Sequence, residues 1–190
     1  TAAGWATPRE VRRAAKIAFG VALLLGLVLV ASGGLAILAL GLFSIGVGLV
    51  IITGGIAPNT QAGVGGKLST PEEAAQHRLI TAAVHAADPE VKICLQILHT
   101  GALAGTPDCV APSAVKSRIG RFTPTALSEA GIEQQIADFA NCAAQAQSAG
   151  YDGVEIIGSA GYLLSTFLVQ KTNLRTDQWG GSWENRMRFP

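Results

Sequence analysis

Hydrophobic and polar residues are distributed very unevenly along this chain of 190 residues. Residues 17–66 contain no Asp, Glu, Lys or Arg, whereas charged residues are interspersed with apolar ones from there to the end. Ser32-Gly33-Gly34 divides the apolar part into a first run that ends at Val30 and a second that extends from Leu35 to about Thr53. A transmembrane helix needs about 20 apolar residues. The pattern therefore predicts a membrane-like helical hairpin over residues 1–50.

The start of this hairpin carries helix-capping and topological signals. Thr7-Pro8-Arg9-Glu10 has the order of a capping box with proline at the first helical position. Arg12, Arg13 and Lys16 follow it, and basic residues before a membrane helix favour a cytoplasmic N-terminus. Two crossings would return the chain to the cytoplasm. We therefore expect a cytoplasmic protein attached to the inner membrane through residues 17–53.

The remainder has the pattern of an α/β protein, beginning with a helix after Thr70. Thr70, Pro71 and Glu73 again form a capping box with proline first, and Asp88-Pro89 ends the helix. The apolar residues expected to share one buried face are Ala74, Leu79, Ile80, Ala83 and Val84.

Two apolar segments flank a second helix in the order that parallel sheets require. Residues 91–98 form a mostly apolar strand, Ser128 caps a helix that extends to about Ala149, and residues 153–157 form the next strand. Alternating strands and helices predict a parallel sheet. Leu49–Thr53 fits either the end of the apolar hairpin or a further strand, and β-branched Val50-Ile51-Ile52 favours the strand.

Composition and charge exclude several classes of function. The net charge is +1, which offers no basic surface for nucleic acid. The three cysteines, Cys94, Cys109 and Cys142, have spacings that fit neither a metal site nor a disulfide framework. We expect reduced thiols that pack in the core, and no metal site.

Five segments carry a resemblance to a known family. They are Thr53–Asn59, Leu95–Gly101, Val110–Ser113, Gly150–Glu155 and Thr172–Phe189. Over about residues 48–190 the chain closely resembles the old yellow enzyme family, in particular its NADPH-dependent 2,4-dienoyl-CoA reductases. The last segment is long and the most specific of the five.

This resemblance implies a fold, a cofactor and three site residues. Family members are TIM barrels that bind FMN, take electrons from NAD(P)H and reduce an activated carbon–carbon double bond in a small enoyl or enone substrate. Gln96 matches the glutamine that hydrogen-bonds the flavin ring, and Gly54 matches a small residue beside that ring. Tyr162 matches the tyrosine that donates a proton to the substrate α-carbon, which suits a phenol that stays protonated at neutral pH.

Other polar residues of these segments are expected to support the fold. We interpret His99 as structural, and Arg175, Asp177, Asn185 and Arg186 as a network that holds the loop after the third strand. Two departures from the family pattern stand out. Ala160 occupies the place of an acidic residue near the tyrosine, and Ala102 that of an arginine after the His-x-Gly motif.

The first 55 residues resemble a different family. Residues 11–15, the glycines of the apolar runs and Thr53-Gly54-Gly55 are similar to a segment of 1,4-dihydroxy-2-naphthoate polyprenyltransferases. The aspartate-rich motifs by which that family holds magnesium and the prenyl diphosphate are absent, since Glu10 is the only acidic residue before Glu72.

The sequence thus predicts a partial TIM barrel over residues 51–190, with three main parallel strands, preceded by the apolar two-helix hairpin. It is interpreted as a truncated FMN-dependent oxidoreductase homologue, inactive by itself because a complete barrel takes about 250 residues. Two alternatives stay open: a small membrane protein or prenyltransferase remnant with a non-catalytic tail, and an artificially joined sequence. A chain that begins with Thr also suggests an excised fragment.

Overall fold

The computed structural model describes Lys16 and residues 50–190, and Val50–Pro190 form one compact unit. The hairpin predicted over residues 1–50, with its membrane and prenyltransferase interpretations, lies almost wholly outside the described residues. In the described part of the chain, no helix is long and apolar enough to cross a membrane.

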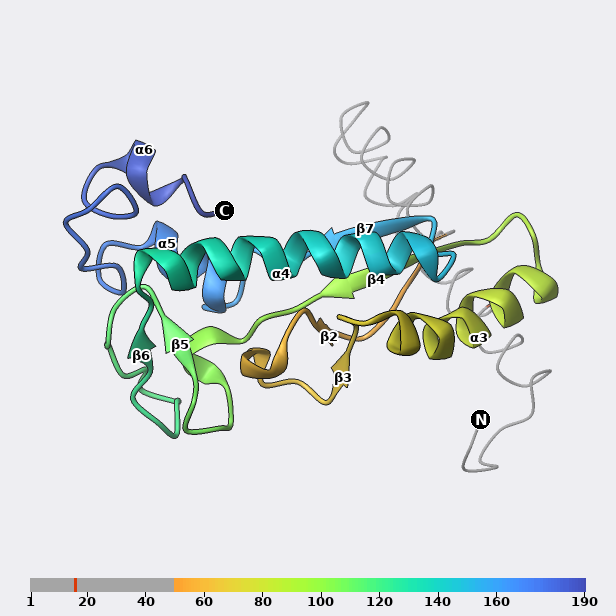
Figure 1. Ribbon diagram of the computed structural model, residues 1–190, viewed down its shortest axis with the longest axis horizontal. Helices are drawn as coiled ribbons and strands as arrows, with labels where there is room; N and C mark the ends of the chain where they lie inside the picture. Colours follow the sequence, from red (N-terminus) through yellow and green to blue (C-terminus); the bar gives the residue numbers. More distant parts are fainter. Residues whose placement is uncertain (1–15, 17–49) are drawn as a thin grey trace, which may run out of the picture. The chain divides into compact units, whose positions relative to one another are not determined.

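A parallel sheet forms the centre of the unit (Figure 1). Strand β4 (Lys92–Ile97) lies between β1 (Val50–Ile52) and β7 (Gly153–Ile156), and both neighbours are parallel to it. Two short strands, β2 (Ile56–Ala57) and β3 (Gly66–Lys67), extend the sheet beside the end of β4. Val50–Ile52 pairs with Lys92–Cys94, which confirms the strand favoured for the contested segment.

Two long helices pack against the sheet, α3 (Pro71–Ala87) and α4 (Glu129–Ser148). Both begin as the sequence predicts. Thr70 Oγ1 accepts a hydrogen bond from the Glu73 amide at 3.3 Å while the Glu73 carboxylate accepts one from the Thr70 amide at 3.2 Å. Ser128 Oγ likewise accepts a hydrogen bond from the Gly131 amide at 3.1 Å.

The remaining elements are short and lie mostly in the connecting loops. They are the 3₁₀ turns η1 (Thr60–Ala62) and η2 (Gly101–Leu103), the paired strands β5 (Val110–Ala111) and β6 (Thr125–Ala126), and the helices α5 (Leu163–Leu168) and α6 (Trp183–Arg186).

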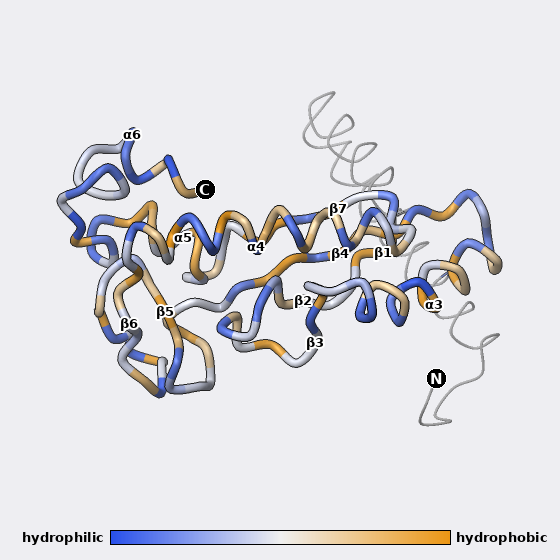
Figure 2. The backbone as a smooth tube through the Cα atoms, in the orientation of Figure 1, coloured by the Kyte–Doolittle hydropathy of each residue, from blue (hydrophilic) through white to orange (hydrophobic). Residues whose placement is uncertain are grey.

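Strand β4 separates the core from the opposite face of the sheet. Ile93, Leu95 and Ile97 are fully buried, because alternate residues of a strand point to the same side and this side meets the helices. Cys94 and Gln96 lie on the other side and are only partly buried. Figure 2 shows the hydrophobic residues of β4, with polar and apolar residues alternating along α4.

Two of the three cysteines are buried as expected, whereas Cys94 is only partly buried on the other face of β4. All three are free thiols, and Cys109 and Cys142 are buried. Burial raises the pKa of the Cys142 thiol to about 12, which keeps it protonated and unreactive.

The buried face predicted for α3 is wrong in part. Ala74 is buried, but Leu79 and Ile80 are 68% and 50% exposed. The helix instead turns Thr81 inward, where its hydroxyl donates a hydrogen bond of 2.6 Å to the Ala149 carbonyl at the end of α4. Ala74 and, in part, Val84 pack against the hydrophobic core on this same side of α3.

A matched pair of isoleucines tests this assignment. Ile132 of α4 is fully buried, whereas Ile80 of α3 is half exposed. We expect Ile132→Ala to lower the free energy of unfolding by about 2–4 kcal/mol and Ile80→Ala by less than about 1 kcal/mol. Urea denaturation of both variants measures the difference. Equal losses would show that Ile80 is covered in the whole chain.

Candidate active site

The predicted ring-binding residues lie in a row across the carboxyl-terminal ends of neighbouring strands. Gly54 is the second residue after β1, and Gln96 is the penultimate residue of β4. Parallel strands end at a common edge, and ligands of α/β barrels bind at this edge. The structure therefore places Gly54 and Gln96, about 40 residues apart in the sequence, at the same edge of the sheet, and their contact with a flavin ring stays a prediction.

Gln96 is held from both sides. Its backbone amide donates a hydrogen bond to Thr53 Oγ1 at 2.9 Å, just beyond the end of the β1 ladder. Its side-chain Nε2 donates to the Glu155 carboxylate at 2.8 Å, because Gln96 and Glu155 are register partners on β4 and β7. Because Gln96 donates to Glu155 through Nε2, its Oε1 remains available as an acceptor.

Sequence reasoning missed the parts played by Glu155 and Thr53. Both belong to the quoted segments, yet neither was assigned a contact with Gln96. The alternation of β7 places Gly153 and Glu155 on one face, and a parallel register would have paired Glu155 with Gln96. A strand-by-strand register argument was the available signal.

The space available for a side chain differs between the neighbouring residues Gly54 and Gly55. A Cβ at Gly55 would lie 2.5 Å from the Leu98 side chain, so packing excludes a larger residue there. A Cβ at Gly54 would meet nothing within 4 Å among the described residues. Protein packing therefore does not demand glycine at position 54, and the space above it is open to a ligand.

Tyr162 lies in the loop between β7 and α5, where it is the N-cap residue of α5. The preceding Ala160 and Gly161 both have left-handed backbone conformations, with φ of 60° and 77°. Ala160 is the only described residue other than glycine with positive φ, a conformation that costs about 1 kcal/mol or more. The chain thus makes a strained turn immediately before Tyr162.

Tyr162 is positioned through the loop that follows β4. The Leu163 amide donates a hydrogen bond of 3.0 Å to the His99 carbonyl. Gly101 allows this approach, because it has a φ of 58° and a Cβ there would lie 2.9 Å from Leu163 Cα. Tyr162 therefore shares the carboxyl-terminal edge with Gln96, but the structure records no contact between the phenol and Gln96 or Gly54.

His99 is structural, as interpreted from the sequence. It is 1% exposed, its Nδ1 accepts a hydrogen bond from the Gly101 amide at 3.1 Å, and its ring stacks on Phe139. Burial lowers the pKa of His99 to about 4, and the nearby Asp138 charge opposes this effect only in part. The neutral imidazole shapes the loop that carries Gly101.

Asn59 connects the first of the quoted segments to helix α4. Its Nδ2 donates hydrogen bonds to Gln135 Oε1 at 2.8 Å and to Asp138 Oδ2 at 2.7 Å, while its Oδ1 accepts one from the Gln61 amide. Gln135 in turn donates to Gln61 Oε1 at 2.9 Å. This network anchors the chain after Gly54 to the helix behind the sheet.

Arg175, Asn185 and Arg186 of the segment Thr172–Phe189 stabilise the surrounding loops, as predicted. The Arg175 guanidinium pairs with Asp177 and donates hydrogen bonds to the Pro112 and Leu127 carbonyls. Arg186 donates to the Leu168 and Gly181 carbonyls, and Asn185 donates to the Asp177 carbonyl. All three side chains bind backbone oxygens, so they are scaffold rather than ligand contacts.

Comparison with known protein families gives one extended match. The NADH:flavin oxidoreductase / NADH oxidase family matches residues 43–190, which begins slightly before the boundary near residue 48 taken from the motifs. Metal reductase of Desulforamulus reducens is 48% identical over 103 residues, or 52% of this chain and 15% of that protein. NADPH dehydrogenase of Geobacillus sp. is 41% identical over 99 residues, or 52% of this chain and 29% of that protein.

Two solved structures are also similar to this chain. Morphinone reductase in complex with tetrahydroNAD is 31% identical with a TM-score of 0.67, covering 74% of this chain and 45% of that one. The old yellow enzyme homologue from Zymomonas mobilis is 29% identical with a TM-score of 0.65, covering 74% and 43%. The chain spans less than half the length of each of these relatives.

The buried histidine predicts a specific pH dependence of stability. The pKa of His99 is about 4 in the fold against 6.5 as its ordinary value, so the unfolded chain binds the proton more tightly. Stability is therefore fully present above pH 6.5 and falls as pH drops toward 4, by about 3 kcal/mol at about 1.4 kcal/mol per pH unit. Urea denaturation at several pH values measures the slope.

His99→Asn provides the matched comparison, because an amide oxygen can accept the Gly101 hydrogen bond but does not titrate. We expect a lower starting stability and a flatter slope between pH 6.5 and 4. The Asp152 and Glu73 carboxyls, whose pKa values fall from 3.8 and 4.5 to about 2 in the fold, add to the slope close to pH 4. The slopes of the parent and of His99→Asn are therefore compared between pH 6.5 and 5. An unchanged slope in His99→Asn would contradict the assignment.

Proposed function

The chain belongs to the NADH:flavin oxidoreductase / NADH oxidase family, and we propose on this premise that residues 50–190 carry the ring-binding and proton-donating part of an ene-reductase site. The family uses FMN and NAD(P)H. The observation that supports the proposal most directly is the row formed by Gly54, Gln96 and Glu155 on three adjacent strand ends.

The residues of this row suit the edge of a flavin ring. Gln96 offers a free Oε1 acceptor and a second N–H beside a fixed one, which matches a ring edge that carries both donors and acceptors. Gly54 leaves open space where a flat ring could approach the backbone. None of the three carries a positive charge, so they provide ring contacts but no counter-charge for a phosphate.

Glu155 positions Gln96 in this scheme. Its carboxylate takes one N–H of the amide, which determines that Oε1, and not Nε2, faces away from β7. Without Glu155 the amide could rotate and present either atom. Glu155 therefore fixes the orientation of the Gln96 amide, which is the neutral donor and acceptor of the row.

Bound FMN would supply a hydride to the β-carbon of an activated double bond. Tyr162 then donates its phenolic proton to the α-carbon, so that the product gains one hydride and one proton, and the phenolate regains a proton from solvent. The left-handed turn at Ala160 and Gly161 and the Leu163–His99 hydrogen bond hold this residue at the strand edge. The substrate class we propose is a small enoyl or enone compound.

A flavin titration tests the ring site. We expect the 190-residue chain to bind FMN with a dissociation constant of about 0.1 mM or weaker, about 5.5 kcal/mol, because the row offers no charge for the phosphate. In ¹H–¹⁵N NMR spectra, FMN should shift the resonances of Gly54 and Gln96, and Gln96→Ala should remove these shifts. Gln147→Ala, on the exposed side of α4, is the control. A protein that keeps its flavin through gel filtration would contradict the weak affinity.

The two tyrosines of the chain test the proton donor. In a flavin-loaded form, Tyr162→Phe should slow substrate reduction by about 10²- to 10⁴-fold and leave flavin reduction by NAD(P)H largely intact. Tyr151→Phe is the matched control, since its hydroxyl contacts His77 on α3 instead of the strand edge. Stopped-flow measurement separates the two half-reactions. If Tyr162→Phe reduced substrate as fast as the parent, Tyr162 would be only a packing residue.

A further inference from the structure

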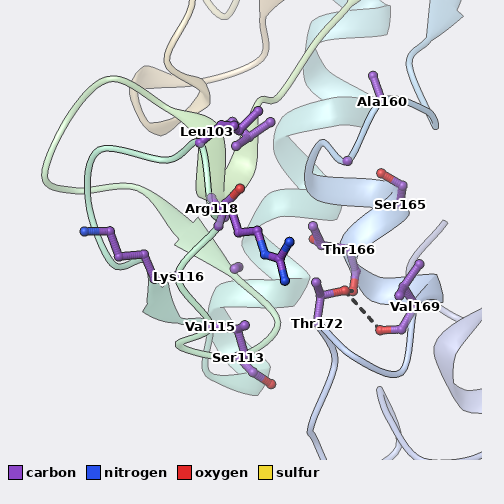
Figure 3. Close-up of a pocket in the computed structure, with 15 residues that line it drawn as sticks. Leu103, Ser113, Val115, Lys116, Arg118, Ala160, Ser165, Thr166, Val169 and Thr172 are labelled. Carbon is purple, nitrogen blue, oxygen red and sulfur yellow. Dashed lines mark hydrogen bonds between the residues drawn. The ribbon is translucent and has the colours of Figure 1, made fainter.

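A pocket of about 490 Å³ lies between the loop at residues 113–119 and helix α5 (Figure 3). Its volume is within the range of small-molecule sites, about 300–1,000 Å³. Ala160 and Gly161, which immediately precede Tyr162, form part of its wall. Ala102, the other position at which the sequence departs from the family pattern, also lines it. Both departures contribute only methyl groups, so they leave this volume open.

The charged residues that line the pocket are all basic. Its lining contains Lys116 and Arg118 but no Asp or Glu. None of the four ion pairs found in residues 50–190 includes Arg118. In Figure 3 the Arg118 guanidinium extends into the cavity toward Thr166 and Thr172, whereas the Lys116 ammonium points away from it. Arg118 is therefore an unpaired cation directed into the pocket.

Three of the five hydroxyl groups that line the pocket already donate to backbone carbonyls, whereas the Ser113 and Ser117 hydroxyls donate to no described residue. Thr166 Oγ1 donates to the Leu163 carbonyl at 2.6 Å, and Thr172 Oγ1 to the Thr166 carbonyl at 2.8 Å. Ser165 Oγ donates to the Tyr162 carbonyl at 3.0 Å. A hydroxyl has one hydrogen, so these three have none left for a ligand. Most of the remaining lining is aliphatic.

We propose that this pocket binds a small organic anion, a carboxylate carried on an apolar body, with Arg118 holding the carboxylate. The planar guanidinium matches a carboxylate in a two-pronged hydrogen bond, and the aliphatic walls take the apolar part. A phosphate ion alone would use the cation but leave the walls empty. The shape and chemistry of the lining therefore favour an amphipathic carboxylate over an inorganic anion.

The pocket also gives the proposed reaction a substrate class. Where the proposed function holds, an α,β-unsaturated carboxylate bound here lies beside the turn that carries Tyr162. Arg118 would then select acids over their uncharged esters and help to withdraw electrons from the double bond. This last step depends on the proposed function, whereas carboxylate binding does not.

Binding of trans-cinnamate to the complete 190-residue chain, without flavin, tests the proposal. Cinnamate should cause saturable ¹H–¹⁵N NMR shifts in residues 113–119 and 160–172. Arg118→Ala should weaken its binding about tenfold, as expected for a hydrogen-bonded charge pair that is partly open to solvent. Methyl trans-cinnamate, which keeps the apolar body but has no charge, should bind equally to the parent and to Arg118→Ala.

Lys116→Ala is the matched control, because it removes a cation from the same loop that points away from the cavity. It should change cinnamate binding by less than about twofold. Absence of saturable cinnamate binding, equal losses in Lys116→Ala and Arg118→Ala, or shifts as large with inorganic phosphate would each overturn the proposal. The cinnamate titration contains no flavin, so its failure is distinguishable from failure of the flavin titration.

Discussion

The packing of β4 against the two long helices is the constraint on which the rest of the described structure depends. Ile93, Leu95 and Ile97 fill the space under α4, and this requirement fixes which face of the strand is buried. Because a strand alternates, Cys94 and Gln96 are then forced onto the opposite face. Hydrophobic burial behind the sheet thus determines that Gln96 is presented in front of it.

The same strand organises its neighbours. β1 and β7 each pair with β4, so Thr53 and Glu155 reach Gln96 from the two sides. The loop that follows β4 then meets α5 through Gly101 and the His99 carbonyl, which places Tyr162 at the same edge. One central strand therefore connects the row of Gly54, Gln96 and Glu155, the turn that carries Tyr162 and the buried His99.

Polar side chains make specific contacts between the loops around this edge and their neighbours. Asn59 binds to α4, Arg175 to two carbonyls of other loops, and Arg186 to two more. The Arg175 and Arg186 contacts satisfy backbone carbonyls of these loops, whereas Asn59 connects its loop to side chains of α4. Within residues 50–190, Arg118 differs from Arg175 and Arg186 in having no acidic or carbonyl partner, so it is available to a ligand.

Much of this arrangement could be predicted from the sequence, because its signals are local. Capping at Thr70 and Ser128 depends on residues within one helical turn, and β4 and β7 show as apolar runs between helices. The long motif from Thr172 to Phe189 identified the family, and the positions of Gly54, Gln96 and Tyr162 followed from the motifs around them.

Features that depend on contacts between segments far apart in the sequence were decided only by the tertiary structure. The inward face of α3 was mispredicted in part, since Leu79 and Ile80 are as apolar as core residues, yet Thr81, with its hydrogen bond to the end of α4, and Ala74 lie on the side that packs. The pairing of Gln96 with Glu155 needs the register of two strands about 60 residues apart. The direction of Arg118 needs the loop and α5 that enclose the pocket. Composition and spacing determine which residues are present and which local elements they form, whereas long-range packing determines which of them meet.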